Sequence, residues 1–339
     1  MLIYLKTYGT KLRVKNSLFQ VSYYDENKHL KRTKFSPEKV KSIWAEQGTS
    51  LSIDAIHLAI AHDIDIVILD KLGRPTGRFL SLYPSTTTYI QKVQVQLSTD
   101  LVAFDFVIEW INKKIDNQIL FLEELGKRRK GHYAQKLSAH VKEMIPIKTQ
   151  LSELPPGLVK DRANSIHGLE GLASRIYFQG LSEVLPSRYK FNGRSRRPPK
   201  DIFNAFLSYG YAILYSVIER SLIKVGLNPF IGFFHRDGHQ LRSMVFDFIE
   251  PFRIYVDRMV FRLFSQKKVF ASHIQAIEGG VYLNYKGKEL LLNAFQKYFH
   301  RKKWLLNREQ RKLVAIIELQ ARNFVKKMLI FYENKSLSV

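Results

Sequence analysis

The chain has 339 residues, with 54 Lys and Arg against 30 Asp and Glu, which gives a formal net charge of +24. It contains no cysteine, which excludes disulfides, iron–sulfur clusters, thiolate zinc sites and a cysteine nucleophile. The excess of positive charge predicts a polyanionic partner. Nucleic acid fits best, because neutralising its phosphates releases condensed counterions, and an anionic membrane surface is the rival partner.

Length and composition favour a protein of roughly two domains with substantial cores, since 45% of the residues are apolar. The start of the chain, MLIYLKTYG, lacks the basic and long apolar regions of a signal peptide. The longest uncharged run, residues 202–218, is interrupted by polar residues and falls short of a membrane span. We therefore expect a cytoplasmic protein with a buried apolar helix and no membrane partner.

The first part of the chain, residues 1–85, reads as a small β-rich domain. Short strands are predicted at LIYLKTY, TKLRVK, LFQVSYY and KVKSIWAE, which turn-prone residues separate. Residues Ser52–Asp63 have apolar residues at helical spacing behind a Ser N-cap candidate, and IDIVILD is typical of a buried strand. Residues 86–100 are interpreted as a linker.

The second part, residues 101–339, is predicted to be mostly α-helical. Helices are expected at Asp161–Gln179, Asp201–Val225, Ser243–Ser265, Lys288–Phe299 and Arg308–Phe331, after a long helical stretch from residue 101. Residues Pro186–Lys200 contain prolines, a glycine and many basic residues, which predicts a loop beside the active site. The expected fold class is therefore α+β with two domains, of which the helical one carries the chemistry.

Potential metal-binding residues lie far apart in this second part: Glu170, His235 and the pair Asp247 and Glu250. Carboxylates suit a hard divalent cation, and a neutral imidazole can join them. Asp247 and Glu250 are three residues apart on an expected helix, so both side chains would project from one face. They lie among bulky apolar residues, where an unpaired charge is costly.

Each of these residues also has a structural interpretation. Asp247 and Glu250 could be solvated acids or form ion pairs with Arg253 and Arg258. Glu170 could be a first-turn glutamate that the helix dipole stabilises, and His235 could be an ordinary core histidine. His167 is a weaker candidate ligand. An HxxxH pair of His235 with His239 is disfavoured because Asp237-Gly238 reads as a turn.

Other chemistries lack their motifs: the chain has no GxxxxGK[ST], GxGxxG, GxSxG or HExxH sequence. The C-terminal segment from Arg262 carries sixteen Lys or Arg against five Glu, a balance of +11. Its RKKW sequence at 301–304 places an aromatic ring suited to stacking beside three cations. These features again favour nucleic-acid binding.

Several segments, in the same order, resemble the CRISPR-associated spacer-acquisition integrase family, the first-numbered Cas protein. HGLEGLASRIYF resembles its glycine-flanked glutamate signature, and RSMVFDFIEPFRIYVDR resembles the signature that supplies its acidic pair. FNGRSRRPPKDIFNAFLSYGYAILYSVIERSLIKVGLNPFIGFFH resembles its arginine/proline stretch, Asn-Ala helix and histidine approach, and KKIDNQILFL resembles its Lys…Asn-Gln helix. The departures are an unusual HRDGHQLRS linker and Glu250 where the family has aspartate.

The resemblance implies that Glu170, His235 and Glu250 bind Mg²⁺ or Mn²⁺ and that Asp247 is a further catalytic acid. It implies an N-terminal β domain that forms a homodimer, and a heterohexamer with a small ferredoxin-like CRISPR-associated partner. The implied activity is the insertion of foreign DNA fragments into the CRISPR repeat array, by attack of a 3′-hydroxyl on a phosphodiester. The same site with water as nucleophile would make the protein a metal-dependent endonuclease.

Double-stranded DNA, both the foreign fragment and the repeat, is the expected substrate. The residues predicted to contact its backbone are Arg194, Arg196, Arg197, Lys200, Arg242, Arg301, Lys302 and Lys303. Two other classes remain open. A stand-alone metal-dependent nuclease of branched or repair intermediates would hydrolyse DNA without joining it, and a DNA-binding scaffold would lose nothing on replacement of Glu170.

Overall fold

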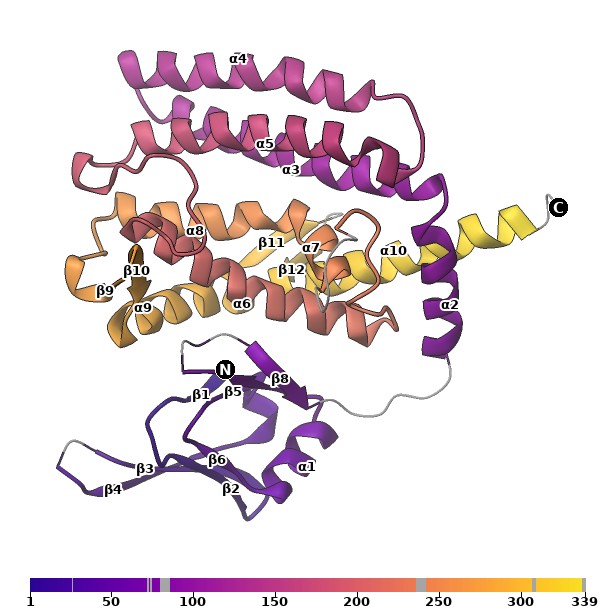
Figure 1. The fold of residues 1–339 in the computed structure, drawn as a ribbon. Coiled ribbons are helices and arrows are strands. Elements are labelled where there is room, and N and C mark those ends of the chain that lie inside the picture. The colour runs from indigo at the N-terminus through magenta and orange to yellow at the C-terminus, as the bar shows by residue number, and fades with distance from the viewer. Residues whose placement is uncertain are drawn as a thin grey trace. The chain divides into compact units, whose positions relative to one another are not determined.

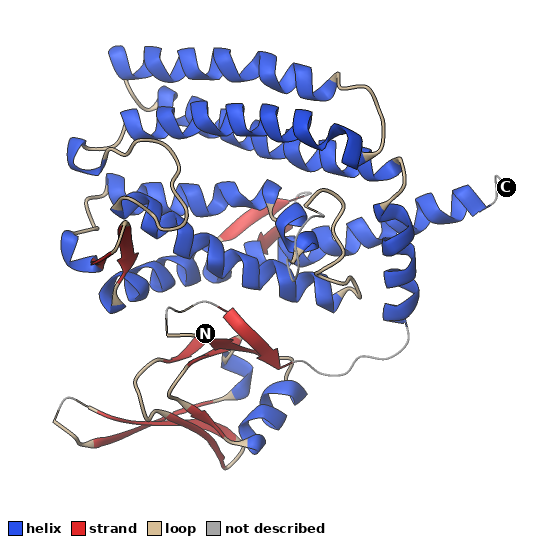
Figure 2. Ribbon diagram, in the orientation of Figure 1, coloured by secondary structure: helices blue, strands red, loops and turns tan. Residues whose placement is uncertain are grey.

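The structure, a computed structural model, describes residues 1–25, 27–71, 73, 75–79, 86–235, 242–306 and 309–336. The chain falls into two compact units, Met1–Pro84 and Ser85–Val339. Strands dominate the first unit and helices dominate the second, which confirms the predicted fold class (Figure 2). The Asp237-Gly238 turn, His239 and the end of the predicted RFLSLYP segment lie outside the described residues.

The described residues of the first unit form two four-stranded sheets and one α-helix. In one sheet the order is β1-β5-β7-β8, with β1, β5 and β7 parallel and β8 antiparallel; in the other it is β4-β3-β2-β6. The strands are β1 Leu2–Leu5, β2 Lys11–Lys15, β3 Leu18–Tyr24, β4 Leu30–Phe35, β5 Ser42–Glu46, β6 Ser50–Leu51, β7 Asp65–Leu69 and β8 Pro75–Phe79. Helix α1 spans Ile53–Ala61, and the Ser52 side chain accepts from the Ala55 N–H at 3.2 Å, which confirms the predicted N-cap.

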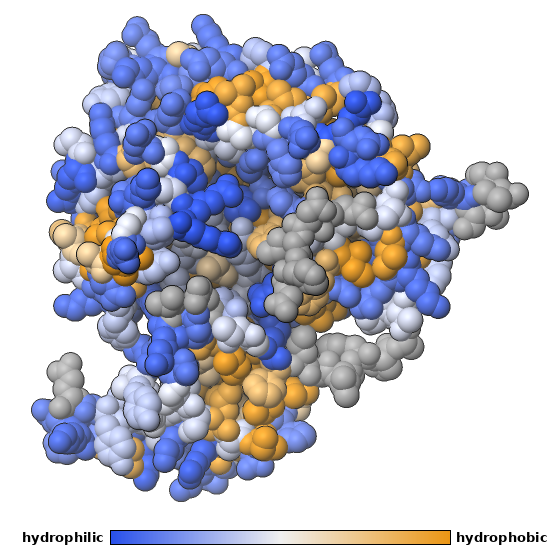
Figure 3. All heavy atoms as spheres, in the orientation of Figure 1, coloured by the Kyte–Doolittle hydropathy of each residue, from blue (hydrophilic) through white to orange (hydrophobic). Residues whose placement is uncertain are grey.

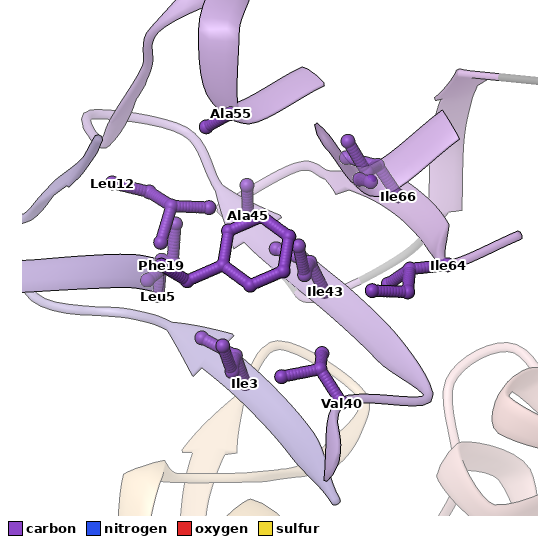
Figure 4. Packing of buried hydrophobic residues seen from close by; sticks show 11 residues of the cluster. Ile3, Leu5, Leu12, Phe19, Val40, Ile43, Ala45, Ala55, Ile64 and Ile66 are labelled. Atoms are coloured by element: carbon purple, nitrogen blue, oxygen red, sulfur yellow. The ribbon is translucent and has the colours of Figure 1, made fainter. Parts of the chain in front are cut away.

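The apolar faces of these sheets and of α1 enclose the core of the first unit. Fully buried Leu5, Leu12, Phe19, Ile43 and Ile66 lie at its centre (Figure 4). Strands β5 and β7, the two inner strands of their sheet, are buried on both faces, whereas burial alternates along β2. The local sequence pattern was therefore sufficient to predict these strands.

The second unit is built from nine α-helices among its described residues. They are α2 Thr86–Ser98, α3 Val102–Lys127, α4 His132–Ser152, α5 Val159–Glu183, α6 Ile202–Lys224, α7 Ser243–Phe248, α8 Arg253–Ser265, α9 Tyr285–Phe295 and α10 Leu313–Ser336. Helices α3, α4 and α5 lie side by side, and α6 packs against α8, α9 and α10 (Figure 1). Helix α6 is long and apolar enough to cross a membrane, but 67% of its most apolar window is buried within the protein. It is the buried helix expected from the sequence.

Three features of this unit correct the predictions. Residues 86–100 are not a linker: α2 occupies most of them and buries Ile90, Val93 and Leu97, in contact with α10. The segment 274–312 is not wholly helical, since it forms two hairpins, with a π-helical turn at Gln296–Arg301 before the second one. The hairpin strands are β9 Ile274–Ile277, β10 Gly280–Leu283, β11 Lys303–Leu306 and β12 Glu309–Lys312.

The third correction concerns the acidic pair. The expected helix Ser243–Ser265 is broken, because a 3-10 turn at Glu250–Phe252 separates α7 from α8. Pro251 causes the break: it has no N–H to donate, and its ring clashes with the preceding turn of an α-helix. Asp247 therefore lies in α7 and Glu250 in the turn, and their side chains contact different partners instead of sharing one helix face.

Candidate active site

Glu170 lies in the middle of α5, well beyond its first turn, so the helix-dipole interpretation is wrong. Its carboxylate accepts from the Ser174 hydroxyl at 3.0 Å and forms an ion pair with the Lys114 ammonium, from α3. Burial raises the pKa of Glu170, but the charge of Lys114 and the hydrogen bonds from Lys114 and Ser174 together outweigh burial, and the net shift is downward. Glu170 is therefore a half-buried, ionised carboxylate.

Glu250 is the second carboxylate at this position and is 4% exposed. The Lys114 Nζ lies 2.6 Å from one of its oxygens, and the Arg253 Nε donates to the other at 2.9 Å. Burial acts to raise the pKa of Glu250, yet the charges of Arg253 and Lys114 lower it to about 2. Arg253 is thus a structural partner, as the ion-pair interpretation proposed, and it shares Glu250 with Lys114.

Lys114 brings the two carboxylates together. Its side chain is only 8% exposed, and its ammonium contacts Glu170 on α5 and Glu250 on the turn after α7. Burial lowers the pKa of Lys114, but the two carboxylates outweigh burial and raise it, so the ammonium stays protonated. A cation therefore already bridges two of the predicted metal ligands.

Asp247 is 2% exposed, and both of its carboxylate oxygens accept hydrogen bonds from the segment that carries His235. Its Oδ2 accepts from the backbone N–H groups of Phe233 at 2.6 Å and Phe234 at 3.0 Å. Its Oδ1 accepts from the N–H of His235 at 3.0 Å and lies 2.6 Å from the His235 Nδ1. Gly232 permits this approach, because a Cβ there would lie 2.9 Å from Oδ2 and 2.5 Å from the Ser243 Cβ.

This arrangement fixes the tautomer of His235. An ionised carboxylate only accepts hydrogen bonds, so the proton is on Nδ1, and Nε2 presents a lone pair. The ring is about one-third exposed and lies 5.7 Å from that of His167, which stacks on Phe234 at 4.1 Å. Burial, and then the neighbouring His235, lower the pKa of His167, which favours the neutral form of that ring.

The donor set fits a hard divalent cation, because two ionised carboxylates converge on one bound cation and an imidazole with a free Nε2 lies nearby. The charge of His235 is close enough to Glu250 to contribute to its lowered pKa. Within the described ranges, however, no three His, Asp or Glu side chains converge closely enough to hold an ion as they stand. The structure thus brings Glu170 and Glu250 together through Lys114, with His235 beside them.

Sequence reasoning assigned no role to Lys114 or Asn117, although both lie in the KKIDNQILFL segment. The Asn117 Nδ2 donates to the Pro251 carbonyl at 2.9 Å and so holds the turn that carries Glu250. A signal for Lys114 was present: it is a charge on the apolar face of α3, next to buried Ile111 and Ile115. A lysine in that position requires buried acidic partners.

The basic loop before α6 is held firmly by buried Asn204. Its side chain donates to the Gly193 carbonyl at 3.0 Å and accepts from the Ser195 N–H at 3.1 Å and from Arg194 at 2.9 Å. Arg194 also donates to Ser208 at 3.0 Å, so its guanidinium is engaged within the protein. The other predicted contacts of this loop, Arg196, Arg197 and Lys200, are exposed.

The remaining predicted DNA contacts differ in their surroundings. The Arg242 Nε lies 3.0 Å from a Glu219 carboxylate oxygen, whereas Arg301 and Lys303 are exposed. The Lys302 ammonium lies over the Trp304 ring, 4.0 Å from its centroid. Trp304 is half-buried and packs against Tyr255 and Tyr298, so its ring does not stand free beside the cations as the RKKW sequence suggested.

Comparison with known proteins identifies the family. The family model described as CRISPR associated protein Cas1 matches residues 3–297. This chain belongs to the Cas1 family. A relative from Archaeoglobus fulgidus, CRISPR-associated endonuclease Cas1 1, is 32% identical over 272 residues, which are 77% of each chain.

Solved structures share the Cas1 fold of this chain. A casposase bound to its integration product superposes with a TM-score of 0.81 at 21% identity, over 96% of this chain and 90% of the other. A Cas6-RT-Cas1–Cas2 complex gives a TM-score of 0.74 at 23% identity and covers 97% of this chain and 35% of the much longer one. The resemblance stated from the sequence motifs is thereby confirmed.

Proposed function

We propose that this member of the Cas1 family is a metal-dependent DNA integrase and endonuclease that inserts foreign DNA fragments into the CRISPR repeat array. The observation that carries the proposal is the Glu170–Lys114–Glu250 bridge, which lies beside His235, whose Nδ1 is held by Asp247. The fold shared with a casposase bound to its integration product supports DNA joining. The relative from Archaeoglobus fulgidus is named an endonuclease, which supports DNA cleavage as a second activity.

Glu170, Glu250 and the Nε2 of His235 would hold Mg²⁺ or Mn²⁺. When bound, such an ion supplies Lewis-acid stabilisation of the negative charge that develops on the phosphate oxygens. Binding to the carboxylate oxygens that Lys114 now contacts requires its ammonium to withdraw from them. Arg253 stays on the far oxygen of Glu250 and keeps that carboxylate ionised.

The reaction that fits the site is transesterification. The 3′-hydroxyl of the incoming fragment attacks a repeat phosphorus, a new P–O bond forms, and the bond to the leaving 3′-oxygen breaks. The attacking hydroxyl gives up its proton to solvent and the leaving oxygen takes one up, so no nucleotide cofactor is consumed. With water as nucleophile the same exchange is hydrolysis.

Asp247 acts in this proposal by positioning His235 and not by transferring a proton to substrate. Both of its oxygens already accept two hydrogen bonds each, and the side chain is closed to solvent. Of the roles considered from the sequence, orientation of a ligand is therefore the one that the geometry supports.

The proposed partners follow from the same comparisons. A Cas1 chain with this fold is part of a complex with Cas2, which supports a CRISPR-associated partner protein. The heterohexamer with a small ferredoxin-like partner is part of our proposal. We propose homodimer formation through the first unit, Met1–Pro84. Hydrophilic side chains cover much of the visible face of the second unit (Figure 3), and a net charge of +24 would attract double-stranded DNA to such a surface.

A strand-transfer assay tests the proposed function. The protein and its small partner are mixed with a short duplex carrying free 3′-hydroxyls, a plasmid with the repeat, and Mn²⁺. We expect joined product from wild type and at least a roughly thousandfold loss for Glu170→Gln, because a neutral amide cannot replace an ionised cation ligand. Glu143→Gln, which changes an exposed glutamate of α4, should join DNA normally.

The other outcomes separate the alternatives. Cleavage without joining, lost in Glu170→Gln, would identify a stand-alone nuclease. DNA binding with no metal-dependent chemistry in wild type would contradict the enzyme proposal and favour a scaffold.

The exposed arginines of the basic loop give a second prediction. Arg196→Ala with Arg197→Ala should weaken binding to duplex DNA, and the slope of log affinity against log salt should fall by about two. Mn²⁺ affinity should stay unchanged, because Asn204 still holds the loop in place. The double variant Lys142→Ala with Lys160→Ala, on α4 and α5, makes the same charge change at exposed sites. Equal effects in the two double variants would mean that only net charge matters.

A further inference from the structure

Helix α2, at the position where the sequence predicted a linker, carries a fully buried glutamine. Gln94 is 0% exposed. Its Nε2 donates to the carbonyls of Asn228 at 3.0 Å and Ile231 at 2.7 Å, and its Oε1 accepts from the N–H of Asn228 at 2.9 Å. The whole amide is therefore used to hold one turn, residues 228–231.

That turn leads directly into the segment that Asp247 holds. Only Gly232 separates Ile231 from Phe233, the first of the three residues whose N–H groups donate to Asp247. The Met244 N–H of α7 donates to the Pro229 carbonyl at 3.1 Å, so the turn also contacts the helix that carries Asp247. The His235 segment is thus clamped at one end by Gln94 and at the other by Asp247.

Helix α2 packs closely on the backbone just before the turn. Gly226 has φ +87°, and a Cβ there would lie 3.0 Å from the Ile90 Cδ1 and 3.3 Å from the Thr87 Cα. A side chain at position 226 would push α2 away, so the close packing keeps Gln94 within reach of the turn. The hydrogen bonds and the packing have the same effect, which is to fix the turn against α2.

We propose that Gln94 is a positioning residue for His235, which acts through the 228–231 turn to place the imidazole for the proposed chemistry. The effect of Gln94 on catalysis rests on the proposed function. Its effect on the position of His235 can be measured without DNA, metal or partner. Loss of the amide removes the partner of the Ile231 carbonyl and of the Asn228 N–H, and it leaves the Asn228 carbonyl with the Ile231 N–H alone. The turn then rearranges, and the hydrogen bonds from Phe233, Phe234 and His235 to Asp247 weaken.

The test compares Gln94→Met, which keeps the shape but not the hydrogen bonds, with two matched changes on α2. Val93→Ala removes a buried apolar group, and Ser98→Ala removes a hydroxyl that bonds to the Val95 carbonyl of its own helix. In Gln94→Met, hydrogen exchange of the Phe233, Phe234 and His235 amides should accelerate about tenfold or more relative to α5. The imidazole Nδ1–H signal of His235, which reports its bond to Asp247, should be lost or broadened.

A titration with Mn²⁺ measures the effect of each variant on metal binding. Affinity should fall about tenfold in Gln94→Met, since residues that orient a ligand typically contribute that much. Val93→Ala should lower the melting temperature and leave both the Mn²⁺ affinity and the His235 signal unchanged. Gln94→Asn keeps the amide on a side chain that is shorter by one methylene and should give an intermediate effect, which provides a second variant if Gln94→Met does not fold.

The outcomes are separable. If Gln94→Met only lowers the melting temperature, as Val93→Ala does, with unchanged amide exchange and His235 signal, Gln94 is purely structural and the proposal is wrong. If wild type binds no Mn²⁺ and joins no DNA, the proposed function fails, while the exchange and imidazole measurements still decide the positioning role.

Discussion

Asp247→Asn should lower the rate of strand transfer at least about a hundredfold, although the two side chains have the same shape. The carboxylate accepts four hydrogen bonds, three of them from backbone N–H groups and one from the His235 Nδ1. An amide turns one acceptor into a donor, so either the N–H groups of Phe233 and Phe234 or the backbone and imidazole N–H groups of His235 lose their partner. Residues that orient a metal-binding histidine typically contribute between about tenfold and a hundredfold, and here the loop is disturbed as well.

A double-mutant cycle shows whether Asp247 acts through His235. Strand transfer is measured for wild type, Asp247→Asn, His235→Ala and the double variant. If the effect passes through the imidazole, Asp247→Asn costs little once His235 is absent, and the two effects are far from additive. Additive losses would mean that Asp247 contributes to the chemistry independently, against the role proposed for it.

Lys114→Met should destabilise the second unit by about 3 kcal/mol at neutral pH, because it leaves the buried Glu250 and the half-buried Glu170 with one cation fewer. Arg253 still neutralises Glu250 in part, but Glu170 loses its ion pair. The measurement is calorimetric unfolding beside Lys113→Met, which changes the exposed neighbouring lysine of α3 and should have little effect.

The pH dependence of this effect has a definite sign. The pKa of Glu250 falls from 4.5 to about 2 in the folded protein, so its stabilisation is present above about pH 4.5 and is lost as the pH falls toward 2. Without Lys114 the pKa values of the two carboxylates rise, and the folded variant takes up a proton at higher pH than wild type does. The stability difference between wild type and Lys114→Met should therefore be largest near neutral pH and shrink under acid conditions. An equal difference in stability at neutral and at acid pH would show that lost packing, and not charge, is responsible.

Much of the fold could be predicted because its signals are local. The β-branched run of β7, the alternation in β2 and the cap at Ser52 each reflect a periodicity or a single hydrogen bond within a few residues. Helix α2 was missed because Thr86-Thr87-Thr88 reads as a polar connector, and its helical state depends on burial of Ile90, Val93 and Leu97. The strands β9 to β12 have four residues each, too few to show a periodicity. Strand β10 is also held by the loop before α6, because the Val281 N–H donates to the Pro199 carbonyl at 2.8 Å.

The sequence by itself determined the kind of chemistry. Its charge indicated a polyanion, its composition excluded thiol chemistry, and the residue types Glu170, His235, Asp247 and Glu250 indicated a hard cation site. Residue type belongs to a single residue, and net charge and composition are sums over all residues. These properties can therefore be read without knowledge of the fold.

Only the tertiary structure decided how those residues divide their roles. Pro251 turned Glu250 away from Asp247, the apolar face of α3 carried Lys114 between the two glutamates, and the turn after α6 brought three N–H groups onto Asp247. Each of these contacts joins elements far apart in the chain, so their energies depend on burial and distance in the folded protein. No local pattern of the sequence records those two quantities, and for that reason the bridge at Lys114 and the clamp at Gln94 became visible only in the structure.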